Sequence, residues 1–414
     1  MKSSTAPKIG IACGGTGGHF FPGVAVAEQL VRRGCEVTLL ISPKDVDQQA
    51  AQKISGMEIV TLPAVGLSGG NKIAFLRGFV QSYRAARKHF RSHPPQAVLA
   101  MGGFTSAPPV LAAKHLGAKT FLHESNTIPG RANRWLSRVV SEAFIGFPQA
   151  SARLHARHVT TTGTPVRPEF QPREAAACRA ALGLDPVRPV LLVVGGSQGA
   201  TGINNLLVNS LPLWKTDWQF LHFTGAADAE RVRHAYAEKN LRAVVHPFFP
   251  EMYQALGAAT VAISRAGASS LAELAAMRVP AVLVPFPAAM DNHQFFNARA
   301  FEETGAARLL EQKDATPECL VSLVTELIIN PTAREKMQAA LLRWHAPDAA
   351  AQISERILQR VGEPGLKSTR HQAPSTRETS SSNHQTAIRA GVSGICMLGL
   401  LWCLVLGAWC FPLP

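Results

Sequence analysis

Three glycine- and serine-rich turns carry the residue types that can bind phosphate groups. They span residues 14–19, 195–200 and 264–273, and each follows an apolar run typical of a strand. Glycine has no Cβ, so a ligand can approach the backbone closely, and the first N–H groups of a following helix have no helical partner. Such turns predict binding of a phosphate or a sugar, although close packing of a strand against a helix also favours glycine.

Two phosphate-binding classes do not fit these turns. The first turn, residues 14–19 (GGTGGH), lacks the GxGxxG order, and the next predicted strand ends at residues 41–44 without the acidic residue that would hold an adenosine ribose. This disfavours a dinucleotide-dependent dehydrogenase. The sequence also contains no GxxxxGK[ST] motif, which excludes a P-loop NTPase.

The third turn combines features of a diphosphate site and a ribose site. Residues 267–270 (GASS) would place free N–H groups and two hydroxyls at a helix start, where the helix dipole stabilises negative charge. Glu273, one turn further along, can accept hydrogen bonds from a ribose diol. It can equally be a capping-box acid paired with Ser269 or Ser270, and the sequence leaves both interpretations open.

One acidic pattern matches a metal site. Asp45-Val46-Asp47 has the DxD spacing that holds a divalent ion against a diphosphate in some enzymes. It follows Pro43 and Lys44 directly, however, and leads into a helical pattern, so we interpret it as the acidic first turn of a helix. We therefore assign no metal.

Short β-rich runs alternate with helical patterns, which predicts parallel sheets covered by helices. Gly14 and Gly195 open the turns of two such series, as two Rossmann-like halves would require. We place the boundary in the Pro-containing segment 163–168, which gives domains over residues 1–166 and 167–362. We expect Pro22 in the first turn of its helix and a last helix over residues 332–360. Strands are predicted at residues 9–13, 37–41, 97–101, 120–123 and 143–145, and then at 190–194, 219–223, 243–246, 261–264 and 281–284.

The composition supports two folded domains and points to an anionic partner. The chain has 414 residues, 46% of them hydrophobic, which excludes a disordered protein. Seven cysteines without a CxxC pair exclude a disulfide scaffold and a Cys-rich zinc site. Residues 1–166 hold 19 Lys and Arg against 7 Asp and Glu, whereas residues 167–362 hold 19 of each. The excess predicts nucleic acid, an anionic membrane surface or a phosphorylated ligand as partner.

Two segments have the composition of membrane-binding elements. Residues 71–93 combine apolar side chains with six basic ones, which suits a surface that binds anionic lipid headgroups; a core helix with a basic outer face would look similar. Residues 363–389 are predicted to be a flexible linker. Residues 390–411 contain no charge and can span a bilayer, so we expect a C-terminal anchor, with a core helix or a spurious extension as alternatives.

Seven motifs in one order are far more specific together than any of them alone. The series resembles the MurG family of glycosyltransferases, which move N-acetylglucosamine (GlcNAc) from UDP-GlcNAc to lipid I and so form lipid II in peptidoglycan synthesis. The resemblance covers about residues 8–360 and not the tail. The motifs are residues 14–19 with Pro22, 102–104 (GGF), 123–126 (HESN), 163–167 (GTPVR), 195–200 (GGSQGA), 264–273 and 291–294 (DNHQ).

The resemblance implies a B-type fold of two Rossmann-like domains, with the acceptor held mainly by the N-terminal domain and the donor by the C-terminal one. Expected partners are UDP-GlcNAc, an undecaprenyl-linked acceptor and the cytoplasmic face of the bacterial inner membrane, without nucleic acid and without a cofactor. Phe249 matches a position that meets uracil through its backbone. The donor contacts that the resemblance implies are Thr16, Gly17, Gly18, Asn126, Arg167, Ser197, Phe249, Ser269, Glu273 and Gln294.

The reaction of that family is an inverting displacement, which needs a base on the attacking hydroxyl and stabilisation of the departing diphosphate. His19 is the expected base because imidazole titrates near neutrality and its loop faces the predicted interdomain cleft. A binding role for His19 is the alternative, and Glu124 is the reserve base. Two other functions stay open: a UDP-sugar transferase acting on a membrane lipid such as diacylglycerol, and an inert, membrane-tethered nucleotide-sugar-binding subunit.

Overall fold

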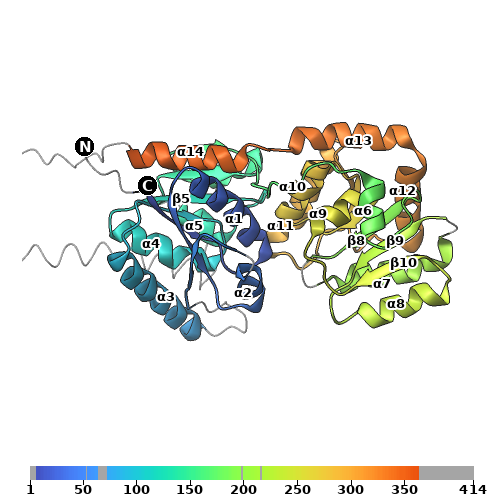
Figure 1. Ribbon diagram of the computed structural model, residues 1–414, viewed down its shortest axis with the longest axis horizontal. Coiled ribbons are helices and arrows are strands. Elements are labelled where there is room, and N and C mark those ends of the chain that lie inside the picture. Colours follow the sequence, from blue (N-terminus) through green and yellow to red (C-terminus); the bar gives the residue numbers. More distant parts are fainter. Residues whose placement is uncertain (1–5, 53, 64–71, 197–198, 215–216, 363–414) are drawn as a thin grey trace, which may run out of the picture.

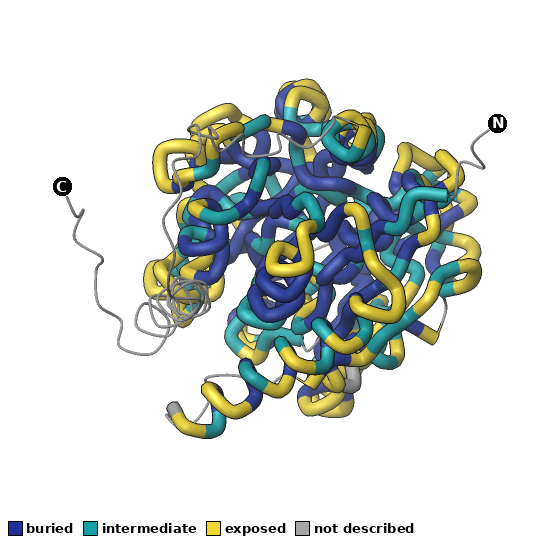
Figure 2. Tube along the Cα trace, turned by 90° about the vertical axis from the view of Figure 1, so that its left-hand side faces the viewer, coloured by how far each residue is buried: buried dark blue, intermediate teal, exposed yellow. Residues whose placement is uncertain are grey.

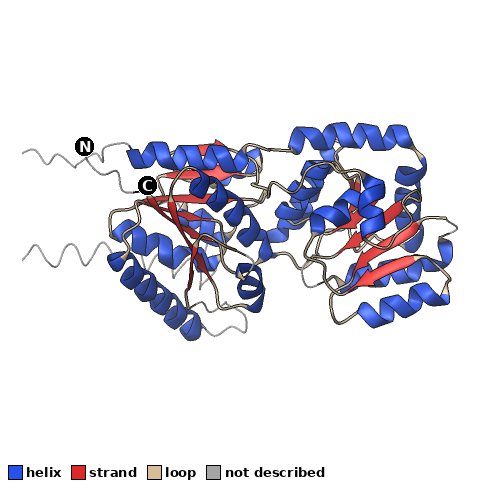
Figure 3. Ribbon diagram, in the orientation of Figure 1, coloured by secondary structure: helices blue, strands red, loops and turns tan. Residues whose placement is uncertain are grey.

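The computed structural model describes residues 6–52, 54–63, 72–196, 199–214 and 217–362. These residues form two α/β domains that lie side by side, each built on a parallel sheet covered by helices (Figures 1 and 3). The predicted fold class of two Rossmann-like domains is thereby confirmed. The predicted linker (363–389) and membrane anchor (390–411) lie outside the described residues, and no helix of the described part is long and apolar enough to cross a membrane.

The N-terminal sheet has seven parallel strands in the order β3-β2-β1-β4-β5-β6-β7. The five predicted strands are present, whereas the two edge strands, β3 and β7, were not predicted, because they are short and carry no buried residue that would produce an apolar run. The strands are β1 (Lys8–Ala12), β2 (Glu36–Ile41), β3 (Glu58–Thr61), β4 (Ala97–Ala100), β5 (Lys119–Glu124), β6 (Glu142–Ile145) and β7 (Val159–Thr161).

Helices cover this sheet, and the sheet separates two buried clusters. Figure 2 shows the buried parts of the chain in the interior of the molecule and the exposed parts at its surface. One buried cluster contains Phe90 and Leu122, and the other contains Leu30 and Phe121, because successive residues of a strand point to opposite faces. The helices are α1 (Gly17–Arg32), α2 (Asp45–Ala51), α3 (Lys72–Ser92), α4 (Ala107–His115) and α5 (Arg131–Leu136), with 3-10 turns at Phe104–Ser106 and Pro148–Arg153.

Helix α3 separates the apolar residues of the predicted membrane-binding segment into two groups. Phe75 and Phe79 are buried in the core. Ile73 and Leu76 are 70% and 38% exposed. Only the second group is therefore available to a membrane surface.

The C-terminal sheet has six parallel strands in the order β10-β9-β8-β11-β12-β13. Its central strands are buried on both faces and read as continuous apolar runs, as Val190–Val194 illustrates. The strands are β8 (Val190–Val194), β9 (Gln219–Phe223), β10 (Ala243–His246), β11 (Val261–Ser264), β12 (Ala281–Leu283) and β13 (Arg308–Leu309). The helices are α6 (Ala175–Ala181), α7 (Thr201–Ser210), α8 (Ala229–Glu238), α9 (Met252–Ala258), α10 (Ala268–Met277), α11 (His293–Glu303) and α12 (Pro317–Ile329), with 3-10 turns at Leu211–Leu213 and Met290–Asn292.

The described part of the chain ends with two helices, so the prediction of one helix over residues 332–360 is wrong. Helix α13 (Pro331–Trp344) stops before Pro347, and α14 (Ala349–Gly362) begins after it. Proline lacks the N–H that a continuing helix needs and clashes with the preceding turn. At this break the chain passes from the C-terminal domain to the N-terminal one (Figure 1).

Helix α14 returns to the N-terminal domain and packs on α1 (Figure 1). Ile353 is fully buried in the core shared with α1, and Arg356 and Arg360 pair with the buried carboxylate of Glu142 on β6 at 2.9 and 3.3 Å. The predicted C-terminal domain, residues 167–362, therefore includes a helix that the structure assigns to the other domain. Local helical pattern cannot reveal this, because it does not say which sheet a helix covers.

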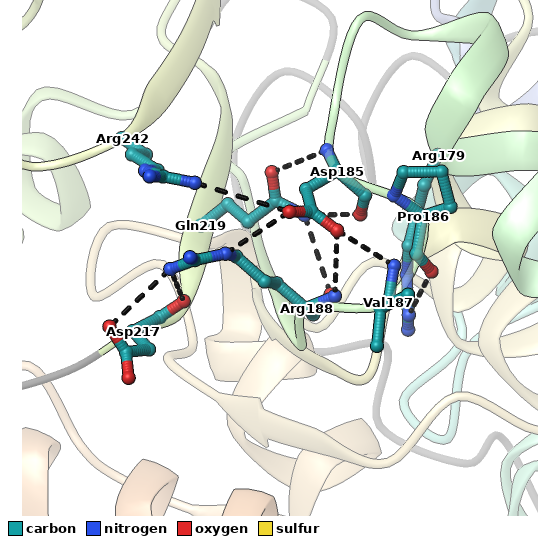
Figure 4. A network of polar contacts seen from close by, with 8 residues as sticks. All are labelled: Arg179, Asp185, Pro186, Val187, Arg188, Asp217, Gln219 and Arg242. Carbon is teal, nitrogen blue, oxygen red and sulfur yellow. Dashed lines mark hydrogen bonds and ion pairs between the residues drawn. The ribbon is translucent and has the colours of Figure 1, made fainter.

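A polar network closes the end of the C-terminal sheet at the amino ends of β8 and β9 (Figure 4). Gln219 accepts from the backbone N–H of Asp185 at 2.8 Å and donates to its carbonyl at 2.7 Å. Arg188 donates to the Asp185 carboxylate at 3.1 Å and to the carbonyl of Asp217 at 3.2 Å. Ligands of α/β sheets bind at the carboxyl ends of the strands. This network lies at the opposite end, so it stabilises the sheet and is not part of the ligand site.

Candidate active site

Strand β1 leads into the first glycine turn, which two side chains hold from opposite sides. Asp47 Oδ2 accepts from the N–H of Gly15 at 2.6 Å, and Lys44 Nζ donates to the carbonyl of Gly15 at 3.1 Å. Asp47 is fully buried and also accepts from Ser42. Because α2 begins at Asp45, the DxD pattern is the first turn of a helix, as predicted, and its second acid shapes the glycine turn.

His19 lies in the first turn of α1 with its ring against a pair of glycines. Gly102 and Gly103 both have positive φ, and a Cβ at Gly102 would lie 2.9 Å from the imidazole, so only glycine lets the ring approach this closely. Thr16, the N-cap residue of α1, has its Oγ1 3.2 Å from His19 Nδ1. Backbone shape and one hydroxyl thus orient the imidazole.

The surroundings of His19 keep it neutral. Burial lowers the pKa of His19 to about 4; Asp47 opposes this shift, whereas His293 and Lys44 add to it. At pH 7 the imidazole is therefore unprotonated and can accept a proton. The contribution of His293 is notable because that residue belongs to α11 of the other domain.

Pro22 leaves one backbone carbonyl near the start of α1 without its helical hydrogen-bond donor. The prediction that Pro22 lies in the first turn of its helix is wrong. Helix α1 begins at Gly17, so Pro22 lies in the second turn. It has no N–H to donate to the carbonyl of Gly18, four residues earlier. Ser269 Oγ donates to that carbonyl at 2.9 Å instead. The missing helical bond is thus replaced by one that joins the two domains.

The start of α10 excludes one of the two interpretations of Glu273. Helix α10 begins at Ala268 with Gly267 as its N-cap and no side-chain cap, so Glu273 lies in the second turn and the capping-box interpretation is wrong. Its carboxylate forms no hydrogen bond with any described residue. Burial raises the pKa of Glu273 to about 7; Arg167 opposes this shift and Glu169 adds to it. A partly buried, unsatisfied carboxylate is well suited to accept hydrogen bonds from a ligand.

Arg167 connects the segment between the domains to α1. Its Nη1 lies 3.1 Å from Glu169 Oε1, and its guanidinium lies 4.4 Å from the ring centre of Phe21. Arg167 also acts electrostatically on Glu273. The Arg167 guanidinium therefore contacts Phe21 of α1 and acts electrostatically on the Glu273 carboxylate of α10.

Glu124 has little capacity left for proton transfer. Its two oxygens accept from the backbone and side-chain nitrogens of Asn126 at 2.9 and 3.1 Å, from the N–H of Gly130 at 3.0 Å and from Asn133 Nδ2 at 2.9 Å. Burial raises the pKa of Glu124, and these hydrogen bonds oppose the rise. The geometry favours a role in orienting Asn126.

The other predicted donor contacts lie in the C-terminal domain. Gln294 Oε1 accepts from the N–H groups of Ala266 and Phe286 at 3.3 and 3.0 Å, and its Nε2 donates to no described residue. Phe249 stacks on Phe223 with ring centres 5.4 Å apart. Ser197 lies outside the described residues.

The structure brings Gly18 of the first turn into contact with Ser269 of the serine turn. Asn126 accepts a hydrogen bond of 3.0 Å from Asn297, which also donates to the carbonyl of Ala266 just before the serine turn. Phe249 stays apart from these contacts. Sequence reasoning missed Asp47 as a support of the turn, because its partner Gly15 is 32 residues away. Asn297 carried a detectable signal, since it lies one helical turn after Gln294 and therefore on the same face.

Two Rossmann-like domains that meet through a glycine turn and a serine turn at helix starts, with a neutral histidine beside them, define a B-type glycosyltransferase. Matches to known proteins agree with this class. Residues 9–145 match the glycosyltransferase family 28 N-terminal domain, and residues 190–353 match the glycosyltransferase family 28 C-terminal domain.

Similar proteins narrow the class to one family. A UDP-N-acetylglucosamine–N-acetylmuramyl-(pentapeptide) pyrophosphoryl-undecaprenol N-acetylglucosamine transferase of Anaeromyxobacter dehalogenans is 36% identical, over 88% of this chain and 99% of its own. A protein of the same name from Xanthomonas axonopodis pv. citri is 38% identical, over 87% and 84%. The crystal structure of Acinetobacter baumannii MurG is 29% identical, with a TM-score of 0.69 over 86% of this chain and all of that one. The chain belongs to the MurG family.

Proposed function

We propose that this protein transfers GlcNAc from UDP-GlcNAc to the C4 hydroxyl of the N-acetylmuramoyl unit of lipid I and thereby forms lipid II for peptidoglycan synthesis. The observation that carries the proposal is the hydrogen bond of 2.9 Å between Ser269 Oγ and the Gly18 carbonyl, with His19 next to Gly18. It joins the starts of α1 and α10, whose free N–H groups favour a diphosphate. The names of the similar proteins supply the acceptor.

In the proposed reaction, His19 accepts the proton of the C4 hydroxyl as the oxygen attacks the anomeric carbon of GlcNAc. The bond between that carbon and the diphosphate oxygen breaks, and UDP leaves with the electron pair. The N–H groups of the two helix starts, including that of Ser269, stabilise the charge that develops on the diphosphate. Attack from the face opposite the leaving group inverts the anomeric centre.

Each of the remaining donor contacts meets a different part of UDP-GlcNAc. Glu273 accepts from the ribose hydroxyls, and Gln294 Nε2 donates to a hydroxyl of GlcNAc. The backbone of Phe249 meets uracil. Thr16, Gly17 and Arg167 line the path of the diphosphate, and Asn126 faces the sugar from the N-terminal domain. The resemblance implies a donor contact for Ser197 as well, which lies outside the described residues.

The test is to incubate the purified protein with UDP-GlcNAc and either lipid I or diacylglycerol and to determine the product mass. The expected result is a gain of one GlcNAc unit on lipid I alone. Transfer to diacylglycerol alone would replace this proposal by the other lipid glycosyltransferase. Binding of UDP-GlcNAc without transfer to either acceptor would favour the inert binding subunit.

The outer face of α3 supports action at the cytoplasmic face of the bacterial inner membrane. Ile73 and Leu76 are exposed there. Further along the helix, Arg84, Lys88 and Arg91 line a surface hollow. Apolar side chains next to basic ones suit insertion among anionic headgroups. The undecaprenyl chain of lipid I would keep the acceptor at this surface.

We further propose that residues 390–411 anchor the chain, with residues 363–389 as a linker. Deletion after Gly362 is then expected to give a protein that high salt releases from membranes, because salt screens electrostatic binding but not apolar insertion. The intact chain should require detergent. Catalysis should survive the deletion, since every proposed site residue precedes Gly362. Release of the intact chain by salt would contradict the anchor.

A further inference from the structure

Asn297 is a buried polar side chain of α11 whose amide is fully hydrogen-bonded. It is 0% exposed. Its Oδ1 accepts from the backbone N–H and the hydroxyl of Thr127, both at 2.9 Å. Its Nδ2 donates to Asn126 Oδ1 at 3.0 Å and to the carbonyl of Ala266 at 3.1 Å. Both proton positions and both lone pairs of the amide are therefore used.

Three of these four bonds cross from one domain to the other. Asn126 and Thr127 follow β5 of the N-terminal sheet, whereas Asn297 and Ala266 belong to the C-terminal domain. Ala266 immediately precedes Gly267, the N-cap of α10. One side chain thus joins the loop after β5 to the residues that lead into the serine turn.

The bond to Asn126 fixes a side chain that would otherwise be held from one end only. Asn126 Nδ2 donates to Glu124, and Asn126 Oδ1 accepts from Asn297. The amide plane is determined by these two contacts together. If the domains separated, Asn297 would lose three hydrogen bonds at once, and Asn126 Oδ1 would lose its donor.

We propose that Asn297 is a positioning residue that couples closure of the two domains to binding of the donor, by holding the Asn126 amide in its donor-binding orientation. The inference rests on the proposed function, because it takes Asn126 as a contact of UDP-GlcNAc. Only the closed arrangement satisfies the Asn297 amide. For a ligand that needs the closed arrangement, the apparent affinity is proportional to the fraction of protein that is closed, so binding weakens as that fraction falls.

The expected result is that Asn297→Ala raises the dissociation constant of UDP-GlcNAc, measured by calorimetry, by about 10-fold or more. Asn297→Ser keeps one donor and one acceptor at the position, so we expect an intermediate loss, and this variant serves if the alanine variant fails to fold. Arg134→Ala is the matched control. It removes another contact between the domains, the ion pair with Asp291, whose partners are about one-third exposed, and should change the constant less than threefold.

A double-mutant cycle separates positioning from a merely structural role. In an Asn126→Ala background, Asn297→Ala should cost at least fivefold less than in the parent, because the side chain that it positions is absent. Equal costs in both backgrounds, or unchanged affinity in a folded Asn297→Ala variant, would overturn the inference and leave the proposed function intact. If the parent does not bind UDP-GlcNAc, the proposed function fails and the inference fails with it.

Discussion

Replacing His19 with alanine is expected to lower turnover by about 100-fold or more while changing the affinity for UDP-GlcNAc less than about threefold. The reason is that His19 lies next to Gly18, where α1 meets the serine turn of α10, and holds a neutral imidazole that can take the proton of the attacking hydroxyl. Steady-state kinetics with lipid I and calorimetry with the donor give the two quantities. Near-normal turnover with a raised acceptor KM would instead make His19 a binding residue.

The pH dependence provides an independent check on this assignment. Because burial lowers the pKa of His19 to about 4, protonation of the free enzyme removes the base only near that pH. On the acid side kcat/KM should therefore fall near that pH, separately from the loss of donor affinity that Glu273 causes between about pH 8 and 6. Bound diphosphate is negatively charged and favours the imidazolium, so the acid limb of kcat should lie at higher pH. Glu124→Gln is the control, since it should keep the acid-side fall of both kcat/KM and kcat. Loss of the acid limb in that variant would make Glu124 the base.

Replacing Glu273 with alanine is expected to weaken binding of UDP-GlcNAc by about 1–3 kcal/mol, or roughly 5- to 150-fold, because the ribose hydroxyls lose their acceptor. UDP should be affected equally, since it carries the same ribose. Gln294→Ala is the matched comparison, because it should weaken UDP-GlcNAc and leave UDP unchanged. Unchanged affinity in Glu273→Ala would refute the ribose contact.

Glu273 also makes donor binding depend on pH in a defined direction. Burial raises its pKa to about 7, so near neutrality a large share of the free protein carries the neutral acid. The ionised form accepts hydrogen bonds from a diol better, and donor binding should therefore release a proton. Affinity is expected to rise as the pH increases from about 6 to 8, and calorimetry in two buffers of different ionisation enthalpy detects the proton. Glu273→Gln should abolish the release.

Local patterns in the sequence determined the fold class, the long strands, the glycine and serine turns and the resemblance to one family of transferases. Strand β8 was predictable because a sheet strand buried on both faces must be apolar at successive positions. The serine turn was predictable for a similar reason, since helix starts, glycines and hydroxyls are neighbours along the chain. Edge strands such as β13, with two residues, leave no such pattern.

Tertiary structure alone decided how distant segments meet. Pro347 interrupts the last helical pattern, but only packing shows that α14 covers the N-terminal sheet, where Arg356 pairs with Glu142. Pro22 is visible in the sequence, and it leaves the Gly18 carbonyl without a helical donor. The donor that replaces it is the hydroxyl of Ser269, 251 residues further along the chain. Hydrogen bonds depend on distance in space and not on distance along the chain. For that reason the contacts at the domain boundary could not be predicted from the residues that form them.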